Sequence, residues 1–164
     1  MRRLAFLAPL AAVLAVAAGP ALADPASITV TLGPDLQEKA RDLGERDVRE
    51  QSDRLAEVVR RALADNAALD GARIDLVLTD LQPNRPTFQQ AADRPGLDIH
   101  RSRSIGGAAI EGSITTADGE VRPVKYDWYS SSLADVRGYG TWHDADRAYR
   151  RLADHLADGR YVTR

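Results

Sequence analysis

The side chains with the clearest chemical potential lie near the carboxyl end of the chain, where His143, Asp144 and Asp146 follow one another closely. Imidazole nitrogen and carboxylate oxygen are ligands that suit zinc or manganese, so these residues could serve a metal-assisted hydrolase together with His100. Neighbouring helical residues point in different directions, however, and no second histidine cluster lies nearby in the sequence. Carboxylates are also favoured in the first turn of a helix by its dipole. We therefore interpret this segment as the start of a helix and predict no metal and no other cofactor.

Serine-based hydrolysis and glycine-loop phosphate binding are also disfavoured. The serines at positions 102, 104 and 130 to 132 do not sit in a G-x-S-x-G elbow. The glycine-rich segment 105–112 lacks both the G-x-G-x-x-G spacing and a Gly-Lys-Ser/Thr ending. Its small residues instead predict that another backbone segment lies tightly against this stretch. We expect no catalytic role for this chain.

A polar segment with two prolines is the first candidate binding element. Residues 79–90 read TDLQPNRPTFQQ and directly follow an apolar run, and Pro83 and Pro86 stiffen the backbone there. We predict a rigid loop that is either a contact surface or a packed lid. Its polar side chains available for binding are Asp80, Asn84, Arg85 and Thr87.

A second candidate is the basic stretch at residues 100–104, whose cations are Arg101 and Arg103. Together with Arg85 and Arg94, these could form a cationic rim that holds a carboxylate or a phosphate. The alternative is a set of solvated charges that pair with nearby aspartates. Among the aromatic residues of the last third of the chain, Trp142 is a candidate binding anchor if it is exposed.

Residues 1–23 have the pattern of a secretory signal peptide. Arg2 and Arg3 precede a long Ala/Leu/Val stretch without acids, which closes on Ala-Leu-Ala, so cleavage is expected between Ala23 and Asp24. An uncleaved membrane anchor is the weaker alternative, because proline and glycine interrupt the run. We predict export to the periplasm, without membrane insertion after cleavage, and one mature domain over residues 24–164.

Charge and cysteine content narrow the classes of function further. The chain has 22 basic and 24 acidic residues; removing the signal leaves 20 basic and 24 acidic residues, a net charge of −4. Nucleic-acid binding is therefore disfavoured, because it needs a concentrated positive surface. The chain contains no cysteine, which excludes disulfides, thiol nucleophiles and the acylated cysteine of a lipoprotein.

The hydrophobic pattern predicts alternating strands and helices. Residues 27–32 and 73–79 alternate as strands, and residues 35–68 carry one apolar helical stripe that Gly44 either splits or kinks, with Ser52 or Asp53 as a possible later cap. Residues 88–96 favour a short helical turn. Asp118-Gly119 favours a hairpin between two further strands, the second at a sheet edge or bulged at Pro123. A last helix is expected from a Thr141 cap to about Ala157.

This order, β-α-β-loop-β-β-α, predicts an α+β fold. We expect a two-layer sandwich in which the helices cover one face of a mostly antiparallel sheet.

Several stretches resemble an uncharacterised family of small exported proteins from alphaproteobacteria. The stretches are DLQPNRPTFQQ (80–90), PGL (95–97), SIGGAAIEG (104–112), VKYDWY (124–129) and TWHDAD (141–146). The glycine strand followed by an Asp-Gly hairpin also resembles, more loosely, envelope proteins with the fold of the TolB amino-terminal domain and of lipoprotein activators of cell-wall synthases. This resemblance implies a role in the cell envelope and supplies no catalytic residues.

We therefore expect a non-catalytic periplasmic module that binds an envelope protein or a small anionic ligand. The loop 80–90, the basic stretch 100–104 and nearby aromatic residues would carry the binding. A metal-assisted hydrolase and a purely structural envelope component are the alternatives.

Overall fold

The computed structural model describes residues 26–64, 66, 69–136 and 140–161. The predicted signal at residues 1–23 lies outside this range. In chain order the elements are β1 (Ser27–Leu32), α1 (Pro34–Leu43), α2 (Glu45–Leu63), β2 (Arg73–Gln82), α3 (Phe88–Asp93), β3 (Gly107–Thr115), β4 (Val121–Tyr129) and α4 (His143–Ala157). None of the helices in these described ranges has the length and apolar character needed to cross a membrane.

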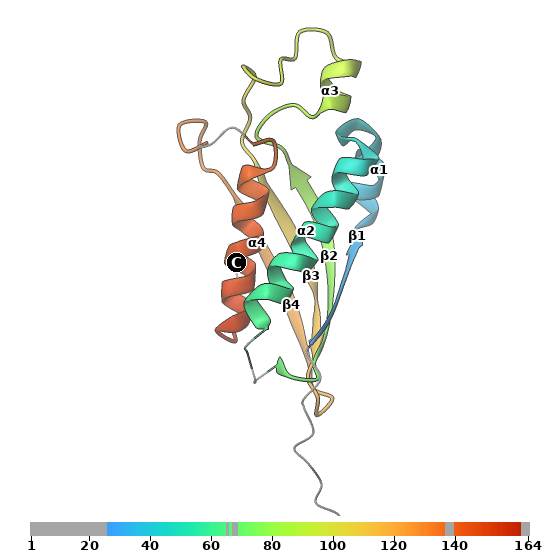
Figure 1. The fold of residues 1–164 in the computed structure, drawn as a ribbon, viewed down its shortest axis with the longest axis vertical. Coiled ribbons are helices and arrows are strands. Elements are labelled where there is room, and N and C mark those ends of the chain that lie inside the picture. Colours follow the sequence, from blue (N-terminus) through green and yellow to red (C-terminus); the bar gives the residue numbers. More distant parts are fainter. Residues whose placement is uncertain (1–25, 65, 67–68, 137–139, 162–164) are drawn as a thin grey trace, which may run out of the picture.

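The four strands form one mixed sheet in the order β1-β2-β3-β4. β1 runs parallel to β2, to which α1 and α2 connect it, while β2 with β3 and β3 with β4 pair antiparallel. Helices α2 and α4 lie side by side across one face of the sheet (Figure 1). The predicted α+β fold, with helices on one face of a mostly antiparallel sheet, is confirmed.

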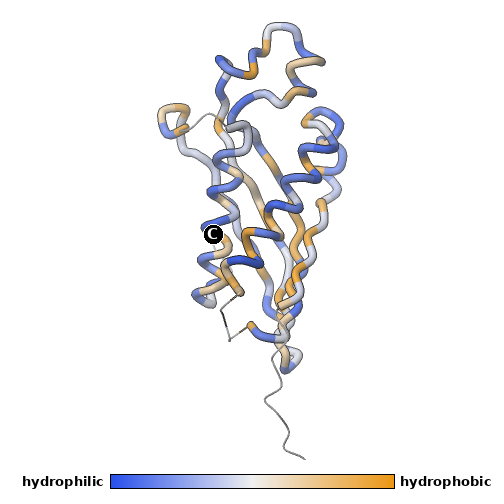
Figure 2. The backbone as a smooth tube through the Cα atoms, viewed as in Figure 1, coloured by the Kyte–Doolittle hydropathy of each residue, from blue (hydrophilic) through white to orange (hydrophobic). Residues whose placement is uncertain are grey.

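The core lies between the helices and this sheet face. Alternating residues of β2 point into it, and Ile74, Leu76 and Leu78 are almost fully buried. The stripe on α4 includes Ala148 and Leu152, which are buried as their helical spacing predicts. Apolar residues accordingly gather along the strands behind the helices (Figure 2).

Gly44 divides the long helical segment into two helices. Its φ of 97° is a conformation that favours glycine, and α1 ends just before it while α2 begins just after it. This settles the choice between a split and a kinked helix. Ser52 and Asp53 lie within α2, so the suggested later cap at these residues is wrong.

The second strand is longer than predicted. It continues three residues beyond Thr79 to Gln82, and a register shift between Leu78 and Asp80 marks an irregularity in its pairing with β3. The shift puts Leu81 on the buried side. Pro83 then ends the strand, because proline fixes φ and has no amide hydrogen for the ladder.

The hairpin is as predicted, and of the two alternatives for Pro123, an edge position and a bulge, the edge position is the one present. Gly119 has a φ of 88° in the turn that joins β3 to β4. β4 is an edge strand, and its pairing with β3 is regular through Pro123. The amide of Lys125 donates outward to the carbonyl of Tyr161 at 3.0 Å. Pro123, two residues earlier, therefore has its missing amide hydrogen on the same outer edge, where no ladder bond is lost.

The close contact between β3 and the backbone of β2 at Gly112 can be tested by substitution. A Cβ at this position would lie 2.1 Å from the Asp75 carbonyl oxygen and 2.9 Å from the Leu76 Cα, both backbone atoms of β2. Gly112→Ala should therefore lower the free energy of unfolding by about 1–3 kcal/mol, as overpacking does. Urea denaturation measures the change. The control is Gly140→Ala, where an added Cβ meets nothing within 4 Å; equal effects of the two substitutions would contradict the prediction.

Candidate binding site

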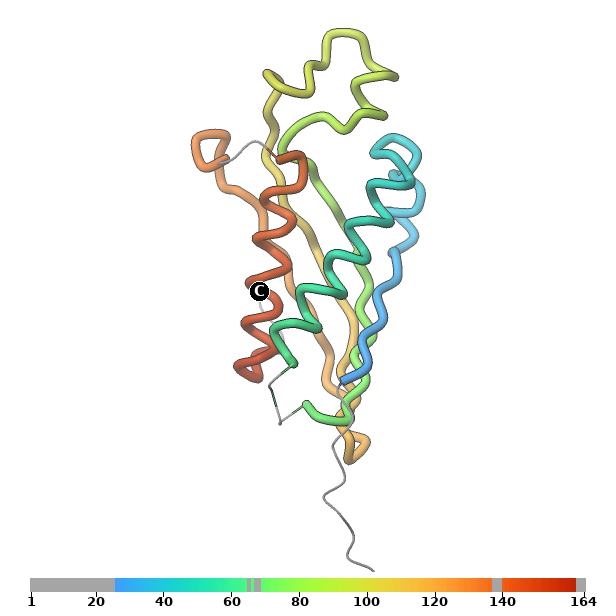
Figure 3. The backbone as a smooth tube through the Cα atoms, in the orientation of Figure 1, coloured from blue at the N-terminus to red at the C-terminus, as the bar shows by residue number. Residues whose placement is uncertain are grey.

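Residues 83–106, here called the cap, connect β2 to β3 and project beyond the end of the sheet (Figure 3). The cap begins with the two-proline loop. Asn84, Arg85 and Thr87 are only 1, 6 and 2% exposed. The start of the predicted loop is therefore packed inward, and it is not a contact surface through these side chains.

Asn84 joins the cap to the first turn of α4. Its Nδ2 donates to Asp144 Oδ2 at 2.6 Å, and the Asp144 amide donates back to Asn84 Oδ1 at 2.8 Å. The first turn of a helix leaves amide groups without intrahelical partners, and the N-cap residue of α4, Trp142, offers no side-chain cap. Asn84 thus caps α4 from a distant part of the chain.

The prediction that Thr141 is the N-terminal capping residue of the last helix is wrong. α4 begins at His143, and Thr141 contributes its carbonyl oxygen, which accepts a hydrogen bond of 2.7 Å from the Asn84 amide. The physical reason is that the Asn84 side chain already occupies the donor that a local cap would bind.

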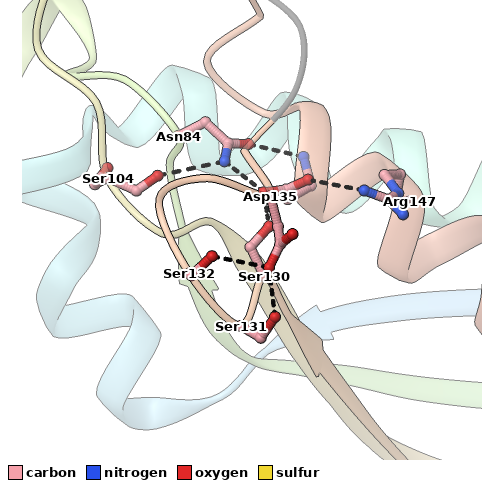
Figure 4. A network of polar contacts seen from close by, with 8 residues as sticks. Asn84, Ser104, Ser130, Ser131, Ser132, Asp135 and Arg147 are labelled. Carbon is pink, nitrogen blue, oxygen red and sulfur yellow. Dashed lines mark hydrogen bonds and ion pairs between the residues drawn. The ribbon is translucent and has the colours of Figure 1, made fainter.

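Ser130, at the end of β4, completes this buried contact (Figure 4). Its hydroxyl donates to Asp144 Oδ2, and its amide donates to the Gly106 carbonyl at 3.0 Å. A Cβ on Gly106 would lie 2.5 Å from Asn84 Nδ2. The proline loop therefore lies tightly against the glycine segment here, through the Asn84 side chain. We call Asn84, Ser130 and Asp144 the polar junction.

The charge of the junction is offset by one arginine. Asp144 is fully buried, and its Oδ1 accepts no hydrogen bond from the described residues. The nearest cation is Arg147, whose Nη1 lies 3.7 Å from that oxygen. The Arg147 guanidinium also stacks over the Trp128 ring at 4.7 Å, which holds it beside the carboxylate.

Thr87 and Arg85 hold the cap together internally. Thr87 and Gln90 form a capping box at the start of α3, in which the Gln90 amide donates to Thr87 Oγ1 at 3.1 Å and the Thr87 amide donates to Gln90 Oε1 at 3.2 Å. The Arg85 Nη1 donates to the carbonyl oxygen of His100, across the cap. Both residues therefore serve the architecture of the cap.

Asp80 lies on β2, outside the cap. Its carboxylate accepts hydrogen bonds from Lys39 Nζ at 2.8 Å and from the Tyr129 hydroxyl at 2.8 Å. Burial raises the pKa of Asp80, but these two bonds and one from Gln82 outweigh burial and hold the pKa below its ordinary value. Burial and the hydrogen bond to Asp80 raise the pKa of Tyr129.

A groove of about 300 Å³ opens between the proline loop, α3 and residues 102–105, which lead into β3. Its apolar lining comes from Pro83, Pro86, Leu97 and Ile105, of which Leu97 is 36% and Ile105 38% exposed. Phe88, also in the cap, is 78% exposed. The remaining lining residues are polar or charged: Gln82, Gln90, Arg94, Ser102, Arg103 and Ser104.

Arg94, Arg101 and Arg103 of the predicted cationic rim belong to this exposed part of the cap, whereas the buried Arg85 does not. Arg101 and Arg103 are exposed, and their guanidinium groups make no ion pair or hydrogen bond with any residue of the described ranges. Arg94 lines the groove and forms an ion pair with Asp42 of α1. Trp142 is half-buried and packs against the core.

The structure thus separates the predicted site residues of the cap into two groups. Asn84, Arg85 and Thr87 lie in the scaffold, and Arg101 and Arg103 lie on the exposed cap. Leu97 and Ile105 were not predicted as groove residues, and Asp144 and Ser130 were not predicted as junction residues. The pattern Thr-x-x-Gln at residues 87–90 is a local sequence signal of the capping box. No comparable local pattern indicates the polar junction.

Asp146, a residue of the hydrolase alternative, is already engaged in ion pairs. Asp146 lies between two arginines, with its oxygens 2.8 Å from Arg54 Nε and 2.7 Å from Arg150 Nη1. Within the described ranges, no three His, Asp or Glu side chains form a group suited to a metal ion. A carboxylate neutralised by two guanidinium groups is a poor ligand or base.

No protein-family model matches the chain, and none of the curated proteins is significantly similar to it. Function is therefore inferred from the geometry of the cap.

The polar junction can be tested by a double-mutant cycle. Asn84→Ala removes one of the two hydrogen-bond donors to the buried Asp144 carboxylate and leaves the α4 terminus without its cap, so the free energy of unfolding should fall by about 2–4 kcal/mol. In the Asp144→Ala background the same substitution should have a smaller effect, with a coupling of about 1–3 kcal/mol. Urea denaturation of the four proteins measures this. Additive effects would show that the two side chains do not act as a unit.

Asp80 should make stability depend on pH in the acidic range. Because its folded pKa is depressed, its contribution is present above the unfolded value of about 3.9 and is lost as the pH falls through the folded pKa. Asp80→Asn should therefore flatten the loss of stability between about pH 5 and pH 3, measured by urea midpoints. Glu38→Gln, which removes an exposed acid from α1, should keep the wild-type slope. A wild-type slope in Asp80→Asn would refute this role.

Proposed function

We propose that this chain is a non-catalytic binding module of the bacterial periplasm, and that the exposed side of the cap is its binding surface. The proposal is supported chiefly by one observation. The groove combines exposed apolar side chains with the guanidinium of Arg103, which has no partner among the described residues. Exposed apolar surface next to unsatisfied charge is typical of recognition sites.

The rigidity of the cap adds to this support. Below the groove, Asn84 fastens the proline loop to α4, and Arg85 ties the loop to the carbonyl of His100. A surface held in one geometry loses little conformational entropy when it binds, which favours affinity. The periplasmic part of the proposal rests on the signal pattern of residues 1–23.

Site-specific photo-crosslinking tests the proposal in the bacterium that encodes the protein. A photoreactive residue replaces Ile105 in the full chain, and the same residue replaces Val121 in a control. Val121 is 63% exposed at the hairpin, on a different part of the sheet. We expect the mature chain in the periplasmic fraction, beginning at Asp24, and a discrete adduct from position 105 that position 121 does not give.

Two further variants make the result specific. Arg103→Glu should abolish the adduct from position 105, because it reverses the unpaired charge in the groove. Arg49→Glu makes the same change of charge at an exposed position of α2 and should leave the adduct intact. Retention of the chain in the cytoplasm, or equal adducts from positions 105 and 121, would refute the proposal.

A further inference from the structure

The cap carries a positive charge that the rest of the protein does not share. Residues 83–106 contain four arginines and two aspartates, a net charge of +2, whereas the whole chain has a net charge of −2. Such local asymmetry attracts a partner of the opposite charge.

The acidic groups of the cap are already occupied. Asp98 accepts hydrogen bonds from the amides of His100 at 2.7 Å and Arg101 at 2.9 Å. These bonds hold the pKa of Asp98 below its ordinary value. Asp93 accepts a bond of 2.8 Å from Gln89. Neither carboxylate forms an ion pair with Arg101 or Arg103, whose charges therefore face solvent.

The apolar part of the groove has room for a large side chain. A volume of about 300 Å³ is at the lower end for ligand sites and fits one aromatic or branched aliphatic residue with its neighbouring backbone. Its apolar walls are Pro83, Pro86, Leu97 and Ile105. Phe88 lies at the start of α3, outside the lining, and offers further apolar contact.

We propose that the groove binds a polypeptide segment in which an aromatic or aliphatic residue is flanked by aspartate or glutamate. This inference rests on the proposed function and adds the class of partner. The apolar residue would fill the groove, and the neighbouring carboxylates would pair with Arg103 and Arg101. A small anion such as phosphate would use the arginines alone and would leave Leu97, Ile105 and Phe88 exposed to water.

Two polar residues that line the groove, Gln90 and Arg94, are held in position by Asp42. Asp42 of α1 accepts from Gln90 Nε2 at 3.1 Å and also pairs with Arg94. Both of these cap residues line the groove. A guanidinium group has five N–H donors. Arg94 therefore keeps donors for a ligand while Asp42 orients its side chain.

A random peptide display library, selected against the mature protein, tests the inference. We expect the enriched peptides to share an aromatic or aliphatic residue with Asp or Glu within about two positions. Their dissociation constants should rise about tenfold or more in Arg103→Glu and in Ile105→Asp, and should also rise with salt. The matched controls, Arg49→Glu and Val121→Asp, should change the dissociation constants less than about twofold. All four positions are exposed, so the variants should fold.

Other outcomes would overturn the inference. Enriched peptides without acids, or peptides that bind Arg103→Glu as well as wild type, would exclude an acidic segment. A titration with inorganic phosphate, followed by amide chemical shifts, would point to a small anion if it alone moved the signals of residues 101–105. In each case an adduct from position 105 in cells would leave the proposed function standing; without that adduct, both proposals fail.

Discussion

One buried contact, the reciprocal pair of hydrogen bonds between Asn84 and Asp144, determines how the cap sits on the sheet. A fully buried carboxylate is unfavourable unless donors surround it, and here Asn84 and Ser130 both donate to it. The same asparagine satisfies an amide of the first turn of α4. Without this contact, the first turn of α4 would lack a partner for its amide, and the loop after β2 would lack its attachment to α4. Gly106 is part of this constraint, because a side chain there would occupy the position of the Asn84 amide.

This constraint divides the cap into a supporting part and an exposed part. Buried polar networks are stabilising only when nearly every member has its partner, which makes them sensitive to position and gives them a defined geometry. Asn84, Arg85 and Thr87 meet this condition below the groove. Arg103 and Ile105, which line the groove, have no such partners among the described residues and face solvent. The proposed binding surface therefore rests on residues that are themselves too buried to contact a ligand directly.

The sequence predicted those features whose signals are local. The alternation in residues 27–32 and the helical stripe of α4 identify their elements because each pattern repeats within a few residues. Gly44 and the Asp118-Gly119 turn were recognisable because positive φ favours glycine. The polar junction was not predictable in this way, since Asn84 and Asp144 are 60 positions apart and neither residue type specifies its partner. For the same reason the buried Asn84 and the exposed Arg103 looked equally suited to binding, although burial separates them completely.

Whether a polar side chain already has a hydrogen-bond or ion-pair partner also bears on the choice between catalysis and binding. A nucleophile or general base needs a free lone pair that a substrate can reach. The Ser130 side chain is only 5% exposed, so a substrate cannot reach its hydroxyl, and Asp146 pairs with two guanidinium groups. The orphan oxygen of Asp144 is buried beside Arg147, where a substrate cannot reach it without moving the guanidinium. The accessible groups of the cap that have no partner among the described residues include the guanidinium groups of Arg101 and Arg103 and the apolar side chains of Leu97 and Ile105. These can attract and hold an acidic, partly apolar partner, which supports the proposed role in recognition.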